Sequence, residues 1–510
     1  MLEGAPAPVI EDEWGYLLSA DTFVAGRATN PTHPLWEQFE AVHQFHVPSY
    51  QSKYPPGQAL FLALGQVLYH PILGAWLGCA LMIASIIWML LAWVSRGWAC
   101  VGGWIATFQY VVVGIPFGGG TWGYWSQSYW GGALAAAGGA MVFGGVARVV
   151  KEARVGPAVI MGAGLLLLAN TRPLEGLIAC LLPALYAFVW LVRQRGAGAR
   201  AAWGRVVLPL ALVLAPGFAA MGWYNQQVTG KATEMPWNTH YEQYCVFPLF
   251  LWQEPVPGRD WNHENLAYFH GKVERYMHER HNTLGGFSKA TAGKIARFGI
   301  FFFGPIYGIV LLLAAGSLLA DRLARMAAAP VALAATAGLA KFNAPPHYQA
   351  AITGLVVLLI VLGLRSLQGK RRLGLEGSAL VRLLLGLSFV GFLGGIAFSV
   401  RNAETTQQSN RRQSERMVEA EPGEHLVLVR FGPKMGNGDE WLFNAADLEG
   451  SRILWARDSS PEARQELLEH YPDRKVWLLR TGFGAAHPRP VPMDRSEPYG
   501  PSEGDGPSRK

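Results

Sequence analysis

Long apolar runs separated by short polar loops dominate residues 1–400 of the chain. A helix needs about 20 apolar residues to cross the roughly 30 Å hydrocarbon core of a bilayer. The runs predict about ten transmembrane helices, near residues 71–95, 98–115, 129–147, 157–170, 175–192, 206–224, 297–319, 327–340, 349–365 and 383–400. A shorter run, 58–69, follows Pro55 and Pro56 and predicts an interfacial or re-entrant helix. The pattern is typical of an all-α polytopic membrane bundle.

The composition agrees with a membrane protein and excludes several other classes. The chain has 510 residues, of which 51% are hydrophobic and 15% charged, whereas soluble proteins are about 25% charged. Its net charge of +7 comes mostly from loops between apolar runs, and no basic stripe interleaved with aromatics indicates a nucleic-acid partner. The four cysteines show no CxxC or paired spacing, so neither a disulfide framework nor a zinc site is indicated.

Basic residues are concentrated in alternate loops. One set of loops contains Arg96, Arg148, Lys151, Arg154, Arg193, Arg195, Arg200, Arg205, Arg322, Arg325, Arg365, Lys370, Arg371, Arg372 and Arg382. The short loops of the other set contain only Arg172 and Lys341. The positive-inside rule assigns the first set to the cytoplasm. We therefore expect residues 1–70, the 225–295 loop, the PPHYQ loop and the chain after residue 400 to lie outside.

The start of the chain is unusual for an exterior segment, because residues 1–10 contain neither a signal peptide nor a span. Either this segment is translocated unaided, or the true start lies upstream and includes a first helix. Pro6, Pro8, Val9 and Ile10 are typical of the end of such a helix and favour the second interpretation.

A change in composition after residue 400 predicts a separate domain. Residues 425–431, 440–443, 452–457 and 475–480 read as short strands. A helix is expected near 461–470, where Ser459 and Ser460 are capping signals and Pro461 suits the first turn. We predict a membrane domain over 1–400, a small exterior α/β domain over 401–485, and a disordered tail over 486–510, which is rich in Pro, Gly, Ser and charge.

Two acidic residues near the start, Asp12 and Glu13, are the first candidates for chemistry. Charged groups near a bilayer are expensive and are functional candidates by default. A carboxylate there could act as general base for an attacking hydroxyl or amine. The alternative is an acidic N-cap for a helix from Glu13 to Val24.

Candidate phosphate ligands follow in other exterior loops. Lys53, beside Tyr54 and Pro55-Pro56, combines a cation with the free N–H groups of a helix start, or alternatively snorkels at the interface. Arg172 in NTRPLEG suits bidentate phosphate binding, or alternatively pairs with Glu175. Two His-Tyr pairs could bind phosphate or sugar hydroxyls, although lone histidines are usually structural: His347 with Tyr348, and His240 with Tyr241.

Two further patterns are weaker. The aromatic stretch GTWGYWSQSYWGG, 120–132, is typical of an interfacial belt or of a stacking platform for sugar or isoprenoid. His33, Glu40, His43 and His46 lie near one another in sequence, but their spacing does not match a zinc pattern. We therefore assign no metal ligand and no certain cofactor.

Taken in order, these motifs resemble the GT-C superfamily of multi-pass glycosyltransferases, in the branch of protein mannosyltransferases and aminoarabinose lipid A transferases. The matching stretches are EDEWGYLLSADTFVAGR, NPTHPLW, SKYPPGQALFLALG, SYWGGALAAAGGA, NTRPLEG and PPHYQAAITGL. They cover most of the membrane part, and the chain resembles a bacterial group with an added C-terminal module. The family's first helix is missing here, which fits the truncated start considered above.

The resemblance implies an enzyme of the bacterial inner membrane that transfers a sugar, with inversion, from a polyprenyl-phosphate donor at the exterior face. The acceptor would be a lipid, a glycan or a protein. The family's acidic pair maps onto Asp12-Glu13, with Asp12 the expected base. Its phosphate-binding lysine maps onto Lys53, and Arg172 or His347 would assist.

A transporter or flippase of lipid-linked sugars is the main alternative, since it too needs basic residues and an aromatic-lined cavity. Such proteins often show internal repeats and broken helices at the bilayer midplane. Here the polar groups concentrate on one face and no convincing repeat is present. A non-catalytic scaffold with a partner-binding exterior module is a third alternative.

Overall fold

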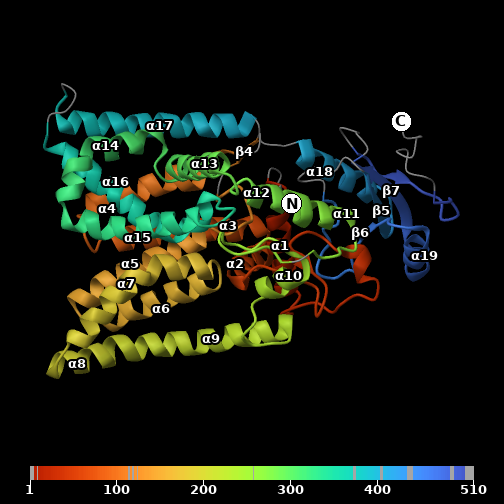
Figure 1. Cartoon of the computed structure of the whole chain (residues 1–510), viewed down its shortest axis with the longest axis horizontal. Helices are drawn as coiled ribbons and strands as arrows, with labels where there is room; N and C mark the ends of the chain where they lie inside the picture. The colour runs from red at the N-terminus through yellow and green to blue at the C-terminus, as the bar shows by residue number, and fades with distance from the viewer. Residues whose placement is uncertain are drawn as a thin grey trace.

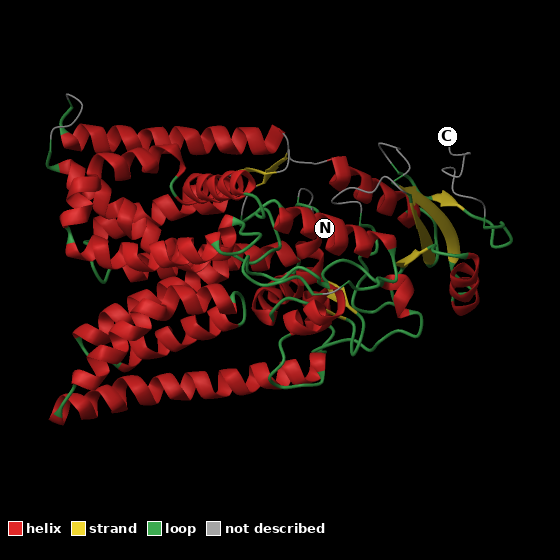
Figure 2. Cartoon of the chain, viewed as in Figure 1, coloured by secondary structure: helices red, strands yellow, loops and turns green. Residues whose placement is uncertain are grey.

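The computed structural model describes residues 5–8, 10–112, 115–117, 120–122, 125–256, 258–370, 375–401, 406–432, 440–482 and 488–499. Helices dominate, and most lie side by side in a bundle at one end of the molecule (Figures 1 and 2). The C-terminal sheet lies at the other end, and loops with short helices fill the space between them. The predicted helical bundle and the small C-terminal α/β module are both confirmed.

Within the described ranges, six helices are long and apolar enough to cross a membrane. They are α3 (Pro71–Leu90), α5 (Ala133–Lys151), α7 (Pro173–Arg193), the continuous α8–η3–α9 (Gly196–Thr229), η5–α16 (Pro346–Gln368) and α17 (Gly377–Arg401), the last over its Gly377–Ala397 part. A seventh span results if α13 (Leu284–Phe302) and α14 (Gly304–Ala320) are taken together, although they meet at a bend of 93°. At this bend Gly304 has φ +56°, in the left-handed region that glycine tolerates.

The count is therefore lower than the ten spans that the apolar runs predict. The run at 98–115 forms only the 11-residue α4 (Arg96–Ala106) followed by a π-helix, η2 (Thr107–Val112). The run at 157–170 forms the 15-residue α6 (Val155–Ala169). At 1.5 Å per residue α4 with η2 reaches at most about 25 Å and α6 about 23 Å, less than the bilayer core. The run at 327–340 belongs to α15 (Arg322–Leu339), which is not among the six helices.

Close packing of small residues holds the centre of the bundle together. The helix α5 is buried along most of its length and is rich in Gly and Ala. A Cβ added at Gly139 would lie 1.8 Å from the carbonyl oxygen of Ala351. Because Ala351 belongs to η5 (Pro346–Ile352), the missing side chain at Gly139 lets α5 support the segment that carries His347.

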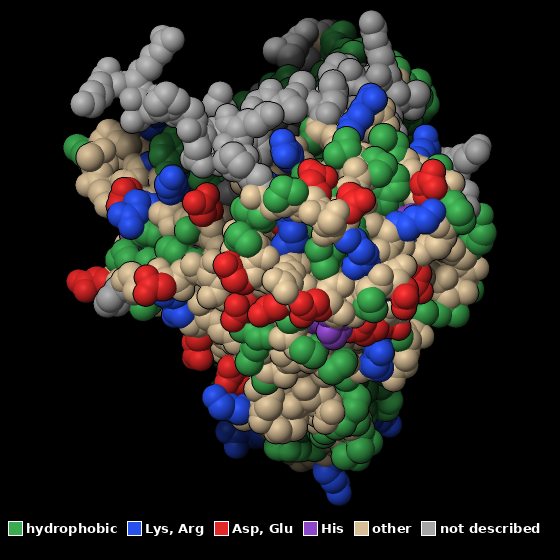
Figure 3. Space-filling model, turned by 90° about the vertical axis from the view of Figure 1, so that its right-hand side faces the viewer, with side chains coloured by type: hydrophobic (Ala, Val, Ile, Leu, Met, Phe, Trp, Pro, Cys, Tyr) green, Lys and Arg blue, Asp and Glu red, His purple; other side chains and the backbone are tan. Residues whose placement is uncertain are grey.

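The segments that contain the candidate site gather where the bundle meets the loops. These segments are α1 (Glu11–Val24), η1 (Trp36–Phe39), the hairpin β1 (Gln44–Phe45) and β2 (Gln51–Ser52), α2 (Pro56–Leu68), α10 (Pro236–Tyr244), and the continuous helix α11 (Glu264–Leu266), η4 (Ala267–Val273) and α12 (Glu274–Glu279). A second hairpin pairs β3 (Ile115–Phe117) with β4 (Gly120–Trp122). The helix α8 (Gly196–Ala202), from the basic set of loops, lies at the opposite end of the bundle (Figure 1). Seen from the loop and module end, the surface carries acidic and basic side chains interspersed, as expected for a water-facing end (Figure 3).

The C-terminal module is a four-stranded sheet of order β6-β5-β7-β8. Its strands are β5 (His425–Phe431), β6 (Ile453–Arg457), β7 (Lys475–Thr481) and β8 (Val491–Pro492), and only β8 is antiparallel to its neighbour. The predicted helix is α19 (Pro461–His470), capped by Ser460, whose Oγ accepts from Ala463 N at 3.1 Å. A further helix, α18 (Thr406–Glu419), precedes the sheet. Because β8 pairs with β7, this part of the expected tail contributes to the module.

The prediction of a strand at 440–443 is wrong. Side chains, not a neighbouring strand, bind the backbone of this segment. Glu440 Oε1 accepts from the N–H groups of Trp441 and Leu442 at 3.0 and 3.1 Å. The Arg411 guanidinium donates to the carbonyls of Trp441 and Phe443 at 2.7 and 3.2 Å. The alternating aromatic pattern instead packs Trp441 and Phe443 into the module's core.

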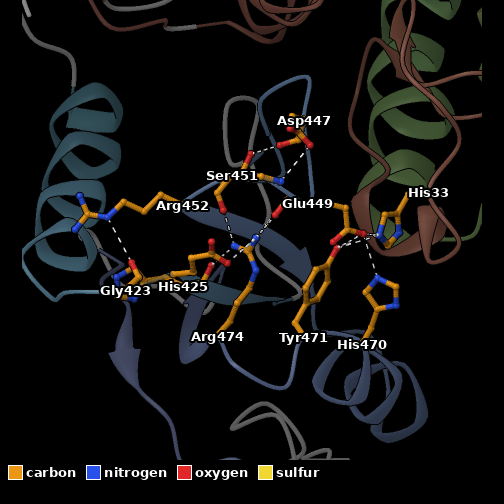
Figure 4. Close-up of polar contacts among 12 residues, drawn as sticks. His33, Gly423, His425, Asp447, Glu449, Ser451, Arg452, His470, Tyr471 and Arg474 are labelled. Atoms are coloured by element: carbon orange, nitrogen blue, oxygen red, sulfur yellow. Dashed lines mark hydrogen bonds and ion pairs between the residues drawn. The ribbon is translucent and has the colours of Figure 1, made fainter. Parts of the chain in front are cut away.

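A polar cluster attaches the module to the N-terminal loop (Figure 4). Glu449 Oε1 contacts His33 Nε2 at 2.8 Å and His470 Nε2 at 3.1 Å, and the Tyr471 hydroxyl lies 2.9 Å from His33 Nε2. The backbone N–H of Leu35 donates to His33 Nδ1 at 2.9 Å, which places the ring proton on Nε2. With that proton in place His33 Nε2 donates to the Glu449 carboxylate and offers no lone pair to a metal. The cluster therefore serves as a hydrogen-bonded contact between the module and the N-terminal loop.

Candidate functional site

The centre of the site is a line of three side chains, Asp12, His43 and Lys53. Asp12 lies in the first turn of α1, where the helix dipole favours an acidic residue. Its Oδ1 lies 3.2 Å from His43 Nε2, and Lys53 Nζ lies 2.7 Å from His43 Nδ1. Since an ammonium only donates, His43 Nδ1 accepts from Lys53 and Nε2–H donates to Asp12. A neutral imidazole thus joins a buried cation to a partly buried carboxylate.

The pKa values of the three groups follow from this arrangement. Burial and the Lys53 charge lower the pKa of His43 to about 4, against the opposing effect of Asp12. Burial alone raises the pKa of Asp12, but the His43 hydrogen bond and the nearby cations outweigh it and hold the pKa below its ordinary range. Burial lowers the pKa of Lys53, and the Asp12 charge opposes this shift. At neutral pH the line therefore holds an ionised Asp12 and a neutral His43.

His43 has a backbone conformation that is unusual for its residue type. Its φ is +68°, in the left-handed region, and it is the one non-glycine residue with positive φ in the part of the chain described. Such conformations persist where the surrounding structure enforces them, often at functional sites. The sequence offered His43 only within the weak metal pattern, and nothing in the spacing indicates its contact with Asp12.

Glu13 has a different environment from Asp12. Its Oε1 accepts from the backbone N–H of Tyr129 at 2.9 Å, and its Oε2 accepts from Ile10 N at 3.3 Å. The second contact is part of a capping box at the start of α1. The helix-cap interpretation thus describes Glu13, while Asp12 lies in the polar line.

Aromatic rings surround the Asp12 carboxylate and the Lys53 ammonium. The Tyr54 hydroxyl hydrogen-bonds to Asp12, and its ring stacks on Tyr16 with centroids 4.4 Å apart. Lys53 Nζ lies 4.7 Å from the centre of the Trp237 ring. Neither Tyr16 nor Trp237 belongs to the candidates taken from the sequence, although Tyr16 follows Asp12 by one helical turn.

Arg172 supplies a second buried cation to the same site. Its guanidinium carbon lies 4.3 Å from the centre of the Tyr348 ring, and its charge interacts with that of Asp12. Among the described residues, its Nε and Nη2 have no hydrogen-bond partner. The alternative of a pair with Glu175 is not what the structure has, because Lys341 Nζ donates to Glu175 instead. Arg172 is therefore available to an anion.

His347 and Tyr348 lie on η5 at the edge of this site. The His347 ring stacks on Trp130, with centroids 4.7 Å apart, and contacts Tyr348 edge-on. His347 also interacts electrostatically with Arg172 and Asp12. Trp130 belongs to the aromatic stretch 120–132, of which the side chains of 120–124 lie outside the described residues.

Of the remaining candidates, His240 lies close to His43 and the others do not. His240 on α10 is buried beside His43, with ring centroids 6.1 Å apart, and burial lowers its pKa well below the usual range. Tyr241, on the other side of α10, is half-buried, and no described contact joins its side chain to Asp12 or Lys53. His33, Glu40 and His46 each have partners of their own, so they do not converge with His43: His33 contacts Glu449, Glu40 accepts from Tyr244 and Asn262, and His46 stacks on Tyr50.

Comparison with known proteins yields distant structural likenesses. No protein-family model and no curated protein matches the chain. The chain is similar to the solved structure of ArnT from Cupriavidus metallidurans in the apo state, with 13% identity over 93% of this chain and 89% of that chain and a TM-score of 0.49. It is also similar to the Archaeoglobus fulgidus oligosaccharyltransferase tethered with an acceptor peptide, with 11% identity over 93% and 65% of the two chains and a TM-score of 0.45. These likenesses carry no residue roles, so function is argued from the site.

Proposed function

We propose that this chain is a membrane glycosyltransferase of the GT-C type, which transfers a sugar from a polyprenyl-phosphate donor to an acceptor with inversion. The observation that supports it most is the meeting of one ionised carboxylate, Asp12, with two buried cations, Lys53 and Arg172, in a single aromatic-lined site. Such a set of side chains can bind an anionic ligand and, at the same time, take a proton from an acceptor.

The cations have the chemistry of a phosphate site. Lys53 is a point charge, and Arg172 offers a planar fork of donors that suits phosphate oxygens. His347 lies beside Arg172 and adds a ring nitrogen to the same side of the site. Tyr54 hydrogen-bonds to the Asp12 carboxylate, and the Tyr348 ring contacts the Arg172 guanidinium. The donor phosphate would therefore bind between Lys53 and Arg172.

In the proposed reaction the acceptor's oxygen or nitrogen attacks the anomeric carbon of the donor sugar. The bond between that carbon and the phosphate oxygen breaks, and its electron pair stays on the phosphate. The acceptor's proton passes to the Asp12 carboxylate. Lys53 and Arg172 stabilise the negative charge that develops on the leaving phosphate.

Donor binding would also prepare Asp12 as a base. In the free site the His43 hydrogen bond, and after it the charge of Lys53, keep the carboxylate acidic and hence weakly basic. A phosphate that pairs with Lys53 would offset the part of this effect that comes from Lys53, and the pKa of Asp12 would rise. The carboxylate would thus accept protons readily only when the donor is in place.

We place the site on the exterior face of a bacterial inner membrane, with the C-terminal module on the same side. The N-terminal loop, α10–α12 and the module lie together at one end of the bundle, and the basic segment α8 lies at the other (Figure 1). This placement follows the positive-inside rule. The acceptor, whether lipid, glycan or protein, would then approach from the module side.

The test uses the full chain purified in detergent and a radiolabelled polyprenyl-phosphate sugar. We expect release of free polyprenyl phosphate together with labelled acceptor, and loss of both in Asp12→Asn and Lys53→Ala. Asp260→Asn, a change at an exposed carboxylate of the same loop region, is the matched control. Movement of intact donor across vesicles without its cleavage would instead identify a transporter.

A further inference from the structure

Three side chains with metal-binding groups meet beside the proposed active site, and a histidine borders them. Cys245 directly follows α10, and His240 lies on that helix. His270 and Glu274 lie on the continuous helix that includes η4 and α12. Their spacing of four residues places both on one face of that helix, toward Cys245. The ligand atoms of Cys245, His270 and Glu274 all lie within 4.8 Å of one another, and His240 does not belong to this group.

The distances between these groups fit a tetrahedral zinc ion. Cys245 Sγ lies 3.8 Å from His270 Nδ1, and His270 Nδ1 lies 3.2 Å from Glu274 Oε2. Zinc bonds of about 2.3 Å to sulfur and about 2.0–2.1 Å to nitrogen or oxygen separate tetrahedral ligands by about 3.6 Å (S to N) and about 3.4 Å (N to O). The observed spacings differ from these by only a few tenths of an ångström.

Without a metal, His240 and Cys245 are poorly satisfied, whereas His270 Nδ1 pairs with Glu274 Oε2. His240 and His270 are 2% and 0% exposed, and Cys245 is also buried. Among the described residues, the sulfur of Cys245 is the only hydrogen-bonding neighbour of His240 Nδ1, and a thiol is a weak partner. Buried polar groups normally have strong partners. A bound cation would use the Cys245 sulfur, the His270 lone pair and the Glu274 carboxylate together.

The charge balance favours a divalent ion in this position. A Cys245 thiolate and the Glu274 carboxylate together carry two negative charges, while His270 binds as a neutral ring. The occupied site would therefore be neutral. It would place no uncompensated charge beside Lys53, which lies close to Cys245 and Glu274.

We propose that Cys245, His270 and Glu274 bind one Zn²⁺ ion. Sulfur and imidazole ligands favour zinc over magnesium or calcium, and three protein ligands leave the fourth tetrahedral position to a water molecule. The ion would fix the end of α10 against α11–α12, beside Lys53. Binding releases the thiol proton of Cys245 to solvent. His240 borders the site through its contact with Cys245 and is not a ligand.

The test measures metal content in the full chain purified in detergent from zinc-supplemented cells. We expect about one zinc per chain, and less than about a tenth of that in the Cys245→Ser/His270→Gln double variant. Cys100→Ser, at an exposed cysteine, and His278→Gln, at a buried histidine of α12 outside the cluster, are matched controls that should keep the metal.

A second measurement covers the case in which the double variant fails to fold. The wild-type chain, stripped by a chelator and loaded with Co²⁺, should show tetrahedral d–d absorption and a thiolate-to-cobalt charge-transfer band, and Cys245→Ser should lose that band. A folded wild-type chain that takes up no stoichiometric zinc, or binds cobalt without a thiolate band, overturns the proposal. Metal content does not depend on turnover, so this outcome is separate from the fate of the proposed transferase activity.

Discussion

The replacement of Asp12 by Asn separates the role of this carboxylate from that of Glu13. Asn keeps an oxygen that can accept from His43 Nε2, now 3.2 Å from Asp12 Oδ1, but it cannot take a proton from the acceptor. General-base catalysis contributes about 10²–10⁴-fold, or roughly 3–5 kcal/mol of barrier. We therefore expect kcat at saturating donor to fall by about that factor, with the thermal transition changing by only a few degrees.

Glu13→Gln should give the opposite distribution of effects. The Gln side chain keeps one oxygen but turns its NH₂ group toward one of two backbone donors, Ile10 N or Tyr129 N, which Glu13 accepts at 3.3 and 2.9 Å. An unsatisfied buried group costs about 1–3 kcal/mol, so stability falls while turnover per folded molecule stays within about tenfold. The assays are release of radiolabelled polyprenyl phosphate and thermal unfolding of the same preparations. If Asp12→Asn kept most of its turnover and Glu13→Gln lost it, the assignment of the base would be refuted.

Three further predictions concern the rest of the site. Lys53→Met removes the buried cation that is proposed to hold the donor phosphate, so the KM for the donor should rise about 10- to 100-fold. The KM should remain unchanged in Lys231→Met, at an exposed lysine, and equal KM values in the two variants would contradict the phosphate site. The free energy of unfolding should fall by about 1.4 kcal/mol per pH unit as the pH falls from 6.5 to 4. The reason is that burial lowers the pKa of His43 in the folded chain to about 4, so the unfolded chain gains this proton first. In pH-dependent unfolding His43→Gln should flatten this slope, and an unchanged slope would show that His43 is not held neutral. Gly139→Ala would place a methyl group 1.8 Å from the Ala351 carbonyl oxygen, at a cost of about 1–3 kcal/mol of stability. By displacing η5 it should reduce both the melting temperature and turnover, and an unchanged melting temperature would show that α5 and η5 are not in this contact.

The sequence by itself determined the features that depend on residue type and local spacing. Apolar runs located the spans, although they overcounted them, because hydrophobic length is a local property, and serine followed by proline marked the start of α19. The same local rules gave Asp12, Lys53, Arg172 and His347 as candidates, since each is a polar residue beside an apolar helix. They failed at 440–443, where alternating aromatics suggested a strand although Arg411 and Glu440 bind the backbone.

Only the tertiary structure decided which of these side chains meet. Asp12 and His43 lie 31 residues apart in sequence, and their contact depends on a positive φ at His43 that no pattern of residue types reveals. Lys341 binds Glu175 and so leaves Arg172 without that partner. This contact joins helices that are far apart in the chain. The Cys245 cluster likewise combines two segments whose ligands look isolated when read in order. Such contacts depend on how helices pack, and packing is set by the shapes of many surfaces at once, which a linear pattern does not encode.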